Sequence, residues 1–292
     1  MKLSNFYAQV VKFGRERDPR SNKGRISSFE DTAILYGRPD TYIKRIMVGI
    51  DIEVGELLLA DSIRRRDGLD LVVAHHPEGP AWAQFYEVMK LQVDMLVKVG
   101  ISRKTAEGLL NERKDEVERR VMPQNHMRSV DAARLLDLPF MCVHTPADNH
   151  VSSFIQALME KRRPKKVEDI LDILNNVPEY KEAGKDNAGP RIILGNPKRP
   201  AGKIFVEMTG GTEGSREVFD KFYKAGIRTL VSMHLSEEHL KKVKDANLNV
   251  VIAGHISSDN LGLNLLLDRI EKEAKERFQV INCSGFRRVQ RS

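Results

Sequence analysis

Four apolar runs that end in histidine constrain the fold of this chain more than any other feature. They span residues 69–76, 139–144, 230–234 and 248–255. The first reads Leu-Asp-Leu-Val-Val-Ala-His-His and the last Leu-Asn-Val-Val-Ile-Ala-Gly-His, so these two are nearly alike. Such runs are typical of strands buried on both faces, as in parallel sheets covered by helices. Because the carboxyl ends of parallel strands meet at one sheet edge, we expect the histidines to gather there.

Apolar periodicity elsewhere completes an α/β pattern. Besides the histidine-tipped runs, strands are predicted at 45–51, 203–208 and 279–282, with helical spacing between the strands. We therefore predict an α/β fold in which two related α/β units pack with the functional site between them. The predicted parts are an N-terminal α/β half at 1–177 with a helical insertion at about 81–136, a connecting segment at 178–202 and a C-terminal α/β half at 203–292.

The composition narrows the class of protein. The 292 residues include two cysteines, Cys142 and Cys283, too few for a disulfide framework or a thiolate zinc site. No run approaches the roughly 20 apolar residues of a membrane span, and the N-terminus lacks the features of a secretory signal. We predict a cytoplasmic protein with no membrane association. The net charge of +7 admits a nucleic-acid partner without requiring one.

The strand ends also carry groups that bind metals. The candidates are an adjacent histidine pair and two His-x-x-x-Asp segments: His75, His76, His144, Asp148, His255 and Asp259. Each segment alone has a structural explanation. The imidazoles could be core residues, and Thr145, Ser257 or Ser258 could cap helices whose first turns favour an aspartate. The recurrence of the pattern favours a metal site.

The chemistry of these side chains fits divalent transition metals. Imidazole and carboxylate ligands suit zinc, iron, manganese, cobalt or nickel and do not select among them. A catalytic zinc commonly takes three protein ligands, so this set is large enough for two ions if a carboxylate bridges them. Two ions about 3.5–4 Å apart can share a hydroxide that attacks a carbon or phosphorus centre.

Other motifs are weaker. Four further histidines are spare candidates for the site: His234, His150, His126 and His239. Of these, His239 lies in a helical stretch rich in glutamate and lysine, where we expect an exposed side chain. A glycine-rich turn at 209–215 precedes a predicted helix, which would suit an anion. Because the turn lacks the spacing of the common phosphate motifs, a tight turn for close packing is favoured.

The order of the histidine motifs resembles that of the Nif-three-like family, whose members are often described as homologues of a second type of GTP cyclohydrolase I. His-His follows an early strand, His-Thr-x-x-Asp stands in the middle, and Gly-His-x-x-x-acid lies near the end. The resemblance extends from about Ile46 to Leu266 and is strongest at 253–262. It implies two facing α/β units, a dinuclear metal centre between them and commonly a toroidal hexamer.

Carried over by position, the resemblance implies that the metal ligands are His75, His76, Asp148, His255 and Asp259. His144 and Thr145 would then lie near the site without binding metal, whereas the residues alone suggest His144 as a ligand.

Three departures from the family pattern bear on the site. Relatives usually have glutamate where Asp259 stands, so bridging by this shorter side chain would require the backbone or the ions to shift. His234 stands where relatives often carry glutamate and is a candidate added ligand or acid–base group. The segment between His76 and His144 is long, and we expect it to cover the site or contact another subunit.

The leading functional interpretation is a divalent-metal-dependent hydrolase of cyclohydrolase or phosphoesterase type, acting on a small or phosphate-containing molecule. His234 and Glu78 are its candidate proton shuttles. The alternatives are a non-catalytic metal chaperone, a regulatory or interaction protein, and a ring that binds nucleic acid. We expect a homo-oligomer, since the resemblance implies a hexamer.

Overall fold

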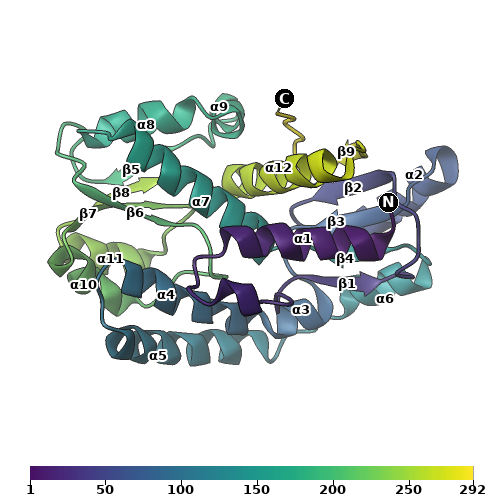
Figure 1. The fold of residues 1–292 in the computed structure, drawn as a ribbon, viewed down its shortest axis with the longest axis horizontal. Helices are drawn as coiled ribbons and strands as arrows, with labels where there is room; N and C mark the ends of the chain where they lie inside the picture. The colour runs from purple at the N-terminus through teal and green to yellow at the C-terminus, as the bar shows by residue number, and fades with distance from the viewer. Residues whose placement is uncertain (292) are drawn as a thin grey trace.

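The computed structural model describes residues 1–291 and contains two sheets that lie side by side (Figure 1). The first sheet has the order β1-β4-β3-β2-β9, formed by Ala33–Tyr36, Phe140–Cys142, Leu71–Ala74, Arg45–Gly49 and Gln279–Asn282. The second has the order β5-β8-β7-β6, formed by Arg191–Leu194, Asn249–Ile252, Ile227–Ser232 and Lys203–Glu207. The α/β prediction is therefore confirmed.

The two sheets share one topology. In each, an antiparallel edge strand (β1 or β5) pairs with the last of three parallel strands, β2-β3-β4 in the first sheet and β6-β7-β8 in the second. This confirms that the halves are related units. The similar runs at 69–76 and 248–255, however, belong to β3 and β8, which are not equivalent. The topological counterpart of β8 is β4, so His255 corresponds to His144.

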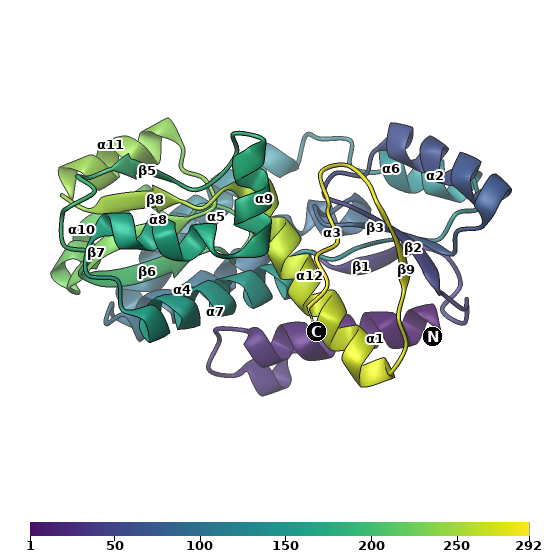
Figure 2. The same ribbon diagram turned by 90° about the horizontal axis from the view of Figure 1, so that it is seen from above.

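The halves exchange a helix. α7 (Thr145–Arg162) follows β4 of the first sheet but packs on the second, where Val151 and Ile155 contact Val206. α12 (His255–Ala274) follows β8 of the second sheet but packs on the first, as Figure 2 shows. The two helices cross in direct contact. Gly262 permits this crossing, because a Cβ there would lie 2.5 Å from the Ala147 carbonyl oxygen. The exchange ties the two halves into one body.

Further helices cover the first sheet. α1 lies with α12 over one face, and α2, α3 and α6 cover the other. Their bounds are Leu3–Arg17, Val54–Asp67, Gly79–Ala83 and Arg128–Leu135. The alternation of the strands explains both cores: Ile46, Val48 and Val73 face α12, while Met47 and Val72 face the opposite side.

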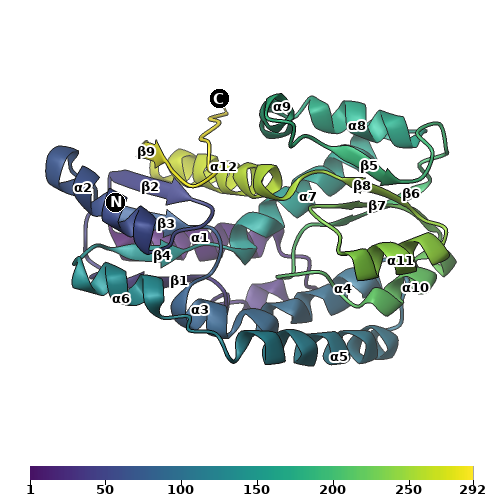
Figure 3. The same ribbon diagram turned by 180° about the vertical axis from the view of Figure 1, so that it is seen from behind.

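The middle of the predicted helical insertion packs on the second sheet rather than the first. The segments involved are η2 (Phe85–Lys90), α4 (Leu91–Lys98) and α5 (Arg103–Val121), joined on that face by η3 (Arg216–Val218), α10 (Phe219–Lys224) and α11 (Glu237–Asp245). Figure 3 shows α4 and α5 running beneath this sheet. Phe205, Leu230 and Val250 supply the sheet side of the core. The insertion thus forms a second bridge between the halves.

The remaining elements complete the layers. η1 (Lys23–Arg25) follows α1, and α8 (Val167–Asn175) and α9 (Pro178–Lys185) lie on the α7 side of the second sheet. The predicted connecting segment at 178–202 contains α9 and β5, and β9 from the predicted C-terminal half completes the first sheet. Within residues 1–291, no helix has both the length and the apolar character needed to cross a membrane.

Candidate metal centre

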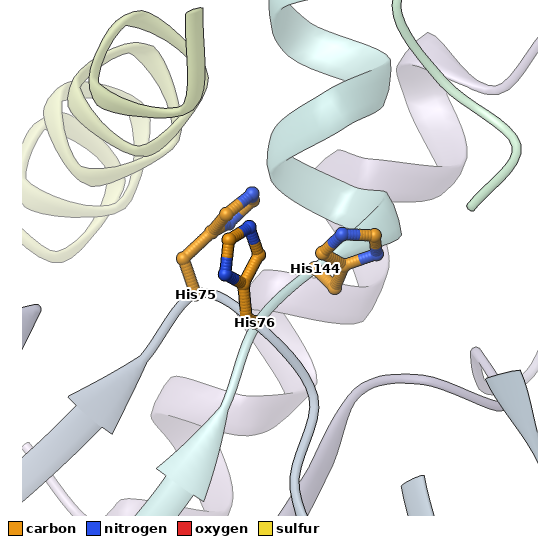
Figure 4. A group of neighbouring side chains, drawn as sticks. All are labelled: His75, His76 and His144. Carbon is orange, nitrogen blue, oxygen red and sulfur yellow. The ribbon is translucent and has the colours of Figure 1, made fainter. Parts of the chain in front are cut away.

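The histidine-tipped strands bring their side chains together between the two halves. His75 and His76 follow β3, His144 follows β4 at the start of α7, and His255 begins α12. Figure 4 shows the first three imidazoles gathered where β3 and β4 end. Their ring centroids lie 4.8–6.0 Å apart. The ring of His255 lies 5.2 Å from that of His76. The predicted gathering of histidines at the sheet edge therefore occurs, and two helix N-termini close it.

His75 lies at the centre of the cluster and is fully buried. Its Nδ1–H donates to the carbonyl oxygen of Val143 at 3.0 Å, which leaves Nε2 as the free ring nitrogen. Nε2 lies 3.4 Å from Oδ1 of Asp148 and 3.4 Å from Oδ1 of Asp259. This ring nitrogen thus faces two buried carboxylates.

Four atoms of this centre are buried without a hydrogen-bond partner: Nε2 of His75, Oδ1 of Asp148, and Oδ1 and Oδ2 of Asp259. Burying a carboxylate without compensation costs several kcal/mol, so such groups normally pair with a cation. Burial alone would lower the pKa of His75, but Asp259 and Asp148 outweigh it and raise that pKa to about 10. Burial likewise opposes ionisation of Asp259, yet His75 and the other imidazoles lower its pKa to about 2. The site is built to hold positive charge.

The two oxygens of Asp259 face different imidazoles. Oδ1 is the oxygen near His75, whereas Oδ2 lies 3.6 Å from Nε2 of His76 and 3.6 Å from Nε2 of His255. Within residues 1–291, three groups could hold a metal ion: His75 with Asp148 and Asp259, His76 with His255 and Asp259, and His75 with His76 and His144. His75, His76 and Asp259 each belong to two of these groups, so the three groups overlap in one cluster.

His144 is held by a buried carboxylate that the sequence analysis did not identify. Its Nδ1–H donates to Oδ2 of Asp31 at 2.8 Å, and the Thr145 hydroxyl donates to the same oxygen at 2.7 Å. The N-cap of α7 is therefore His144 rather than Thr145, whose hydroxyl serves Asp31 instead. A carboxylate behind an imidazole fixes its tautomer and orientation, which leaves Nε2 of His144 free toward the cluster.

Asp51 was missed as well. It follows β2, and its Oδ1 accepts a hydrogen bond from Nδ1–H of His76 at 2.6 Å. This bond lowers the pKa of Asp51 and directs Nε2 of His76 toward Asp259. No motif marks Asp31 or Asp51 in the sequence, because each acts through a contact with a strand end that is distant in the chain.

The start of α12 also differs from the sequence interpretation. The helix begins at His255, with Gly254 as its N-cap at φ 107°, a conformation that favours glycine. The hydroxyl groups of Ser257 and Ser258 donate to the Gly254 carbonyl oxygen rather than capping a later helix. Asp259 therefore lies one full turn into the helix, on the same side as His255.

A cleft of about 450 Å³ leads to the centre. His76, His144, His234 and His255 line it, together with Glu78 and both ends of the helical insertion. The insertion thus forms part of the wall of the cleft while its middle packs on the second sheet. His126 also lines this cleft, outside the metal-binding groups.

His234 and Glu78 both reach the cleft and both have shifted pKa values. Nδ1 of His234 lies 3.7 Å from Oε1 of Glu213, which raises the pKa of the imidazole. Burial opposes ionisation of Glu213, but His234 and the Ser236 amide outweigh it and lower its pKa to about 2. Burial raises the pKa of Glu78 to about 7. His234 is therefore stabilised in its protonated form by a neighbouring carboxylate, whereas Glu78 is kept from ionising by burial.

The two remaining histidines lie away from the centre. His150 is buried on α7, where Nδ1–H donates to Pro146 at 2.7 Å and burial lowers its pKa to about 4. The prediction that His239 is exposed is wrong: its side chain is buried between Ser236 and Gly214 and contacts both. Its charged sequence neighbours face solvent, while His239 occupies the opposite face of α11.

The glycine-rich turn at 209–215 packs against the insertion. The Gln92 side-chain amide donates to the carbonyl oxygens of Gly210 and Thr212, both at 2.8 Å. A Cβ at Gly210, whose φ is +100°, would lie 2.6 Å from Cγ of Gln92. These contacts support the interpretation of a tight turn that allows close packing.

No protein-family model and no curated protein matches the chain significantly. Solved structures do match it. A NIF3 superfamily protein from Sphaerobacter thermophilus is 28% identical with a TM-score of 0.78, over 96% of this chain and 98% of that one. Reduced HcgD from Methanocaldococcus jannaschii is 14% identical with a TM-score of 0.54, over 97% of each chain. A Bacillus cereus protein related to NIF3 is 8% identical with a TM-score of 0.52, over 96% of each. The last two likenesses concern the fold alone.

Proposed function

We propose that this chain, which belongs to the NIF3 superfamily, binds two divalent metal ions and is a metal-dependent hydrolase. One observation carries the metal proposal: four potential ligand atoms of His75, Asp148 and Asp259 are buried together in this cluster without a hydrogen-bond partner. Oxygen and imidazole donors in this number suit zinc, iron, manganese, cobalt or nickel.

The ligands divide naturally into two sets. His75 and Asp148 would hold one ion, and His76 and His255 the other, with one oxygen of Asp259 on each side. This split supports Asp259 as the bridging group despite its short side chain, since α12 begins at His255 and brings the carboxylate between the two sets. His144 lies against the first set and is a further candidate ligand.

When bound, two such ions would supply Lewis acidity and an acidified water for attack on a carbon or phosphorus centre. The residues of the chain would supply proton transfer and positioning. Glu78, whose pKa is about 7, can accept or donate a proton near neutral pH. His234 lines the same cleft, and Glu213 orients its imidazole and stabilises the protonated form. A small or phosphate-containing molecule is the substrate class that the cleft of about 450 Å³ supports.

Assembly and location follow the same proposal. We infer a homo-oligomer, a hexamer by family resemblance, in the cytoplasm, where the two free cysteines would remain reduced. Its alternative is a non-catalytic metal-binding member of the superfamily, which would share the centre but not the turnover.

Metal content and turnover test the proposal together. Protein purified without chelator should contain about two transition-metal ions per chain by elemental analysis. His255→Ala should lower this content, and His126→Ala is the matched control, because His126 lines the same cleft outside the metal-binding groups. A panel of phosphoesters, cyclic nucleotides and cyclic amides should include one substrate whose hydrolysis His255→Ala abolishes.

The outcomes separate the two parts of the proposal. Failure to find metal in the purified protein, and failure to load zinc, manganese or iron afterwards, would contradict the centre itself. Full metal content without hydrolysis of any substrate, together with ready transfer of the metal to a chelator or client, would favour the non-catalytic alternative.

A further inference from the structure

An aromatic wall leads along the cleft to the metal centre. The ring centroids of Trp82 and Phe85 lie 4.9 Å apart, and that of Phe85 lies 5.5 Å from that of His144. All three side chains line the cleft. The wall therefore joins the helical insertion to a residue of the candidate centre.

The Trp82 side chain is held in place by a partner from the far end of the insertion. Its Nε1–H donates to Oε1 of Gln124 at 3.0 Å, and the amide of Gln124 donates to the Arg120 carbonyl oxygen at 2.9 Å. A ring whose orientation is fixed in advance loses little conformational freedom when a ligand stacks on it. The indole is only half-buried, so part of it stays accessible from the cleft.

The cleft is lined by one arginine and three acidic residues. Arg128, at the start of α6, lines the cleft and forms no ion pair with residues 1–291. Of the carboxylates, Asp51 is paired with His76, and Glu53 lies at the cleft edge, where its backbone amide donates to Glu56. Glu78 is half-buried; burial raises its pKa, while a hydrogen bond with Ser129 opposes this rise. Arg128 is thus the single arginine or lysine side chain of the cleft lining, and no ion pair within residues 1–291 occupies it.

We infer that this cleft binds a small molecule with a flat aromatic ring and an anionic group. The ring would stack on the half-buried indole of Trp82, against which the buried Phe85 packs, and the anion would lie between Arg128 and the metal centre. The inference names the substrate class of the proposed hydrolase and rests on that proposal. Stacking between a base and an aromatic side chain typically contributes about 1–3 kcal/mol, and a guanidinium recognises carboxylate or phosphate through paired hydrogen bonds.

Trp82 is the single tryptophan of the chain, so its fluorescence reports on this cleft alone. Adenosine 5′-monophosphate serves as the complete probe, ribose 5-phosphate lacks the ring, and adenosine lacks the anion. We expect the complete probe to quench Trp82 and to bind about tenfold more tightly than either partial probe. Metal content is measured on the same preparation.

Calorimetry on three variants locates the contacts. Trp82→Leu should weaken the complete probe about tenfold and leave ribose 5-phosphate unchanged, whereas Arg128→Gln should bring the complete probe down to the affinity of adenosine. Tyr42→Leu removes an exposed aromatic ring outside the cleft and should change neither value.

Equal affinities for the complete probe and ribose 5-phosphate, with full metal content, would overturn this inference and leave the metal proposal standing. An unchanged affinity in a folded Trp82→Leu variant would also overturn it. The wild-type protein could instead fail to load any metal and still bind the complete probe more tightly than ribose 5-phosphate. That result would overturn the hydrolase proposal and leave the aromatic subsite standing.

Discussion

The two strand–helix junctions at the centre, β4 to α7 and β8 to α12, have the same topology and unlike environments. Each places a histidine at the helix start and an aspartate four residues later. His144 is buried and bonded to Asp31, whereas the His255 side chain is 41% exposed and has no carboxylate behind it in residues 1–291. The β4–α7 junction is thus the rigid side of the site, and the β8–α12 junction is its open side.

The aspartates of the two junctions, Asp148 and Asp259, also differ in the imidazoles that they contact. Asp148 has Oδ1 near His75 and Oδ2 3.7 Å from Nδ1 of His144, so it serves only the first half. Asp259 reaches imidazoles that follow both β3 and β8. The second half therefore supplies Asp259, which contacts imidazoles of both halves. The first half supplies Asp148, which contacts imidazoles of its own half only.

The largest expected effect is on metal loading. Asp259→Asn should remove nearly all bound metal, because it alters a ligand of both sets, whereas Asp148→Asn should remove about half. Elemental analysis after gel filtration measures both. Asparagine matches the shape of aspartate, and circular dichroism in the presence of chelator checks that both variants fold. Equal losses in the two variants would show that Asp259 does not bridge.

The ends of the buried strands could be predicted from the sequence, because such a strand is a run of apolar residues. The run ends at the first polar residue, where the chain leaves the buried part of the sheet. That is why β9, β6 and the histidine positions agree with expectation to within a residue or two. β1 was not predicted, since its short run, Ala-Ile-Leu-Tyr, is half-buried at a sheet edge and carries no such signature.

The contacts that complete the site have no local signature. Asp31 and Asp51 precede or follow short strands as ordinary loop acids, and only the tertiary fold brings them to His144 and His76. The helix exchange between halves is likewise invisible, because an apolar helix face does not state which sheet it will cover. The likeness of the runs before His75 and His255 was misleading, since buried strands draw on the same few residues whatever their position in the sheet.

A second expected effect contrasts the pH dependence of the two halves in metal-free protein. The folded-state pKa of His75, about 10, lies above its ordinary value of 6.5. Its stabilising contribution is therefore complete below about pH 6.5 and is lost as the pH rises through 10. Burial lowers the pKa of His255, so its protonation opposes folding, and the corresponding stability is lost as the pH falls below 6.5.

Urea unfolding in the presence of chelator, between about pH 5 and about pH 10, measures the opposite slopes of the free energy of unfolding against pH. His75→Asn should flatten the alkaline decline, and His255→Asn should flatten the acid one. With metal bound, the alkaline decline should disappear, since metals bind the neutral imidazole and the ionised carboxylate. An alkaline decline that survives in His75→Asn would assign it to another group.

The smallest of the three effects tests the rigid side directly. Asp31→Asn keeps the shape of a fully buried side chain but removes the charge that accepts hydrogen bonds from His144 and from the Thr145 hydroxyl and amide. We expect it to lower the free energy of unfolding of the metal-free protein by about 3 kcal/mol. On the open side, His255→Asn should change it by less than about 1 kcal/mol at neutral pH, because that side chain is partly solvated. If both substitutions cost the same, the halves are equally rigid, and the asymmetry between Asp31-bound His144 and exposed His255 has no energetic basis.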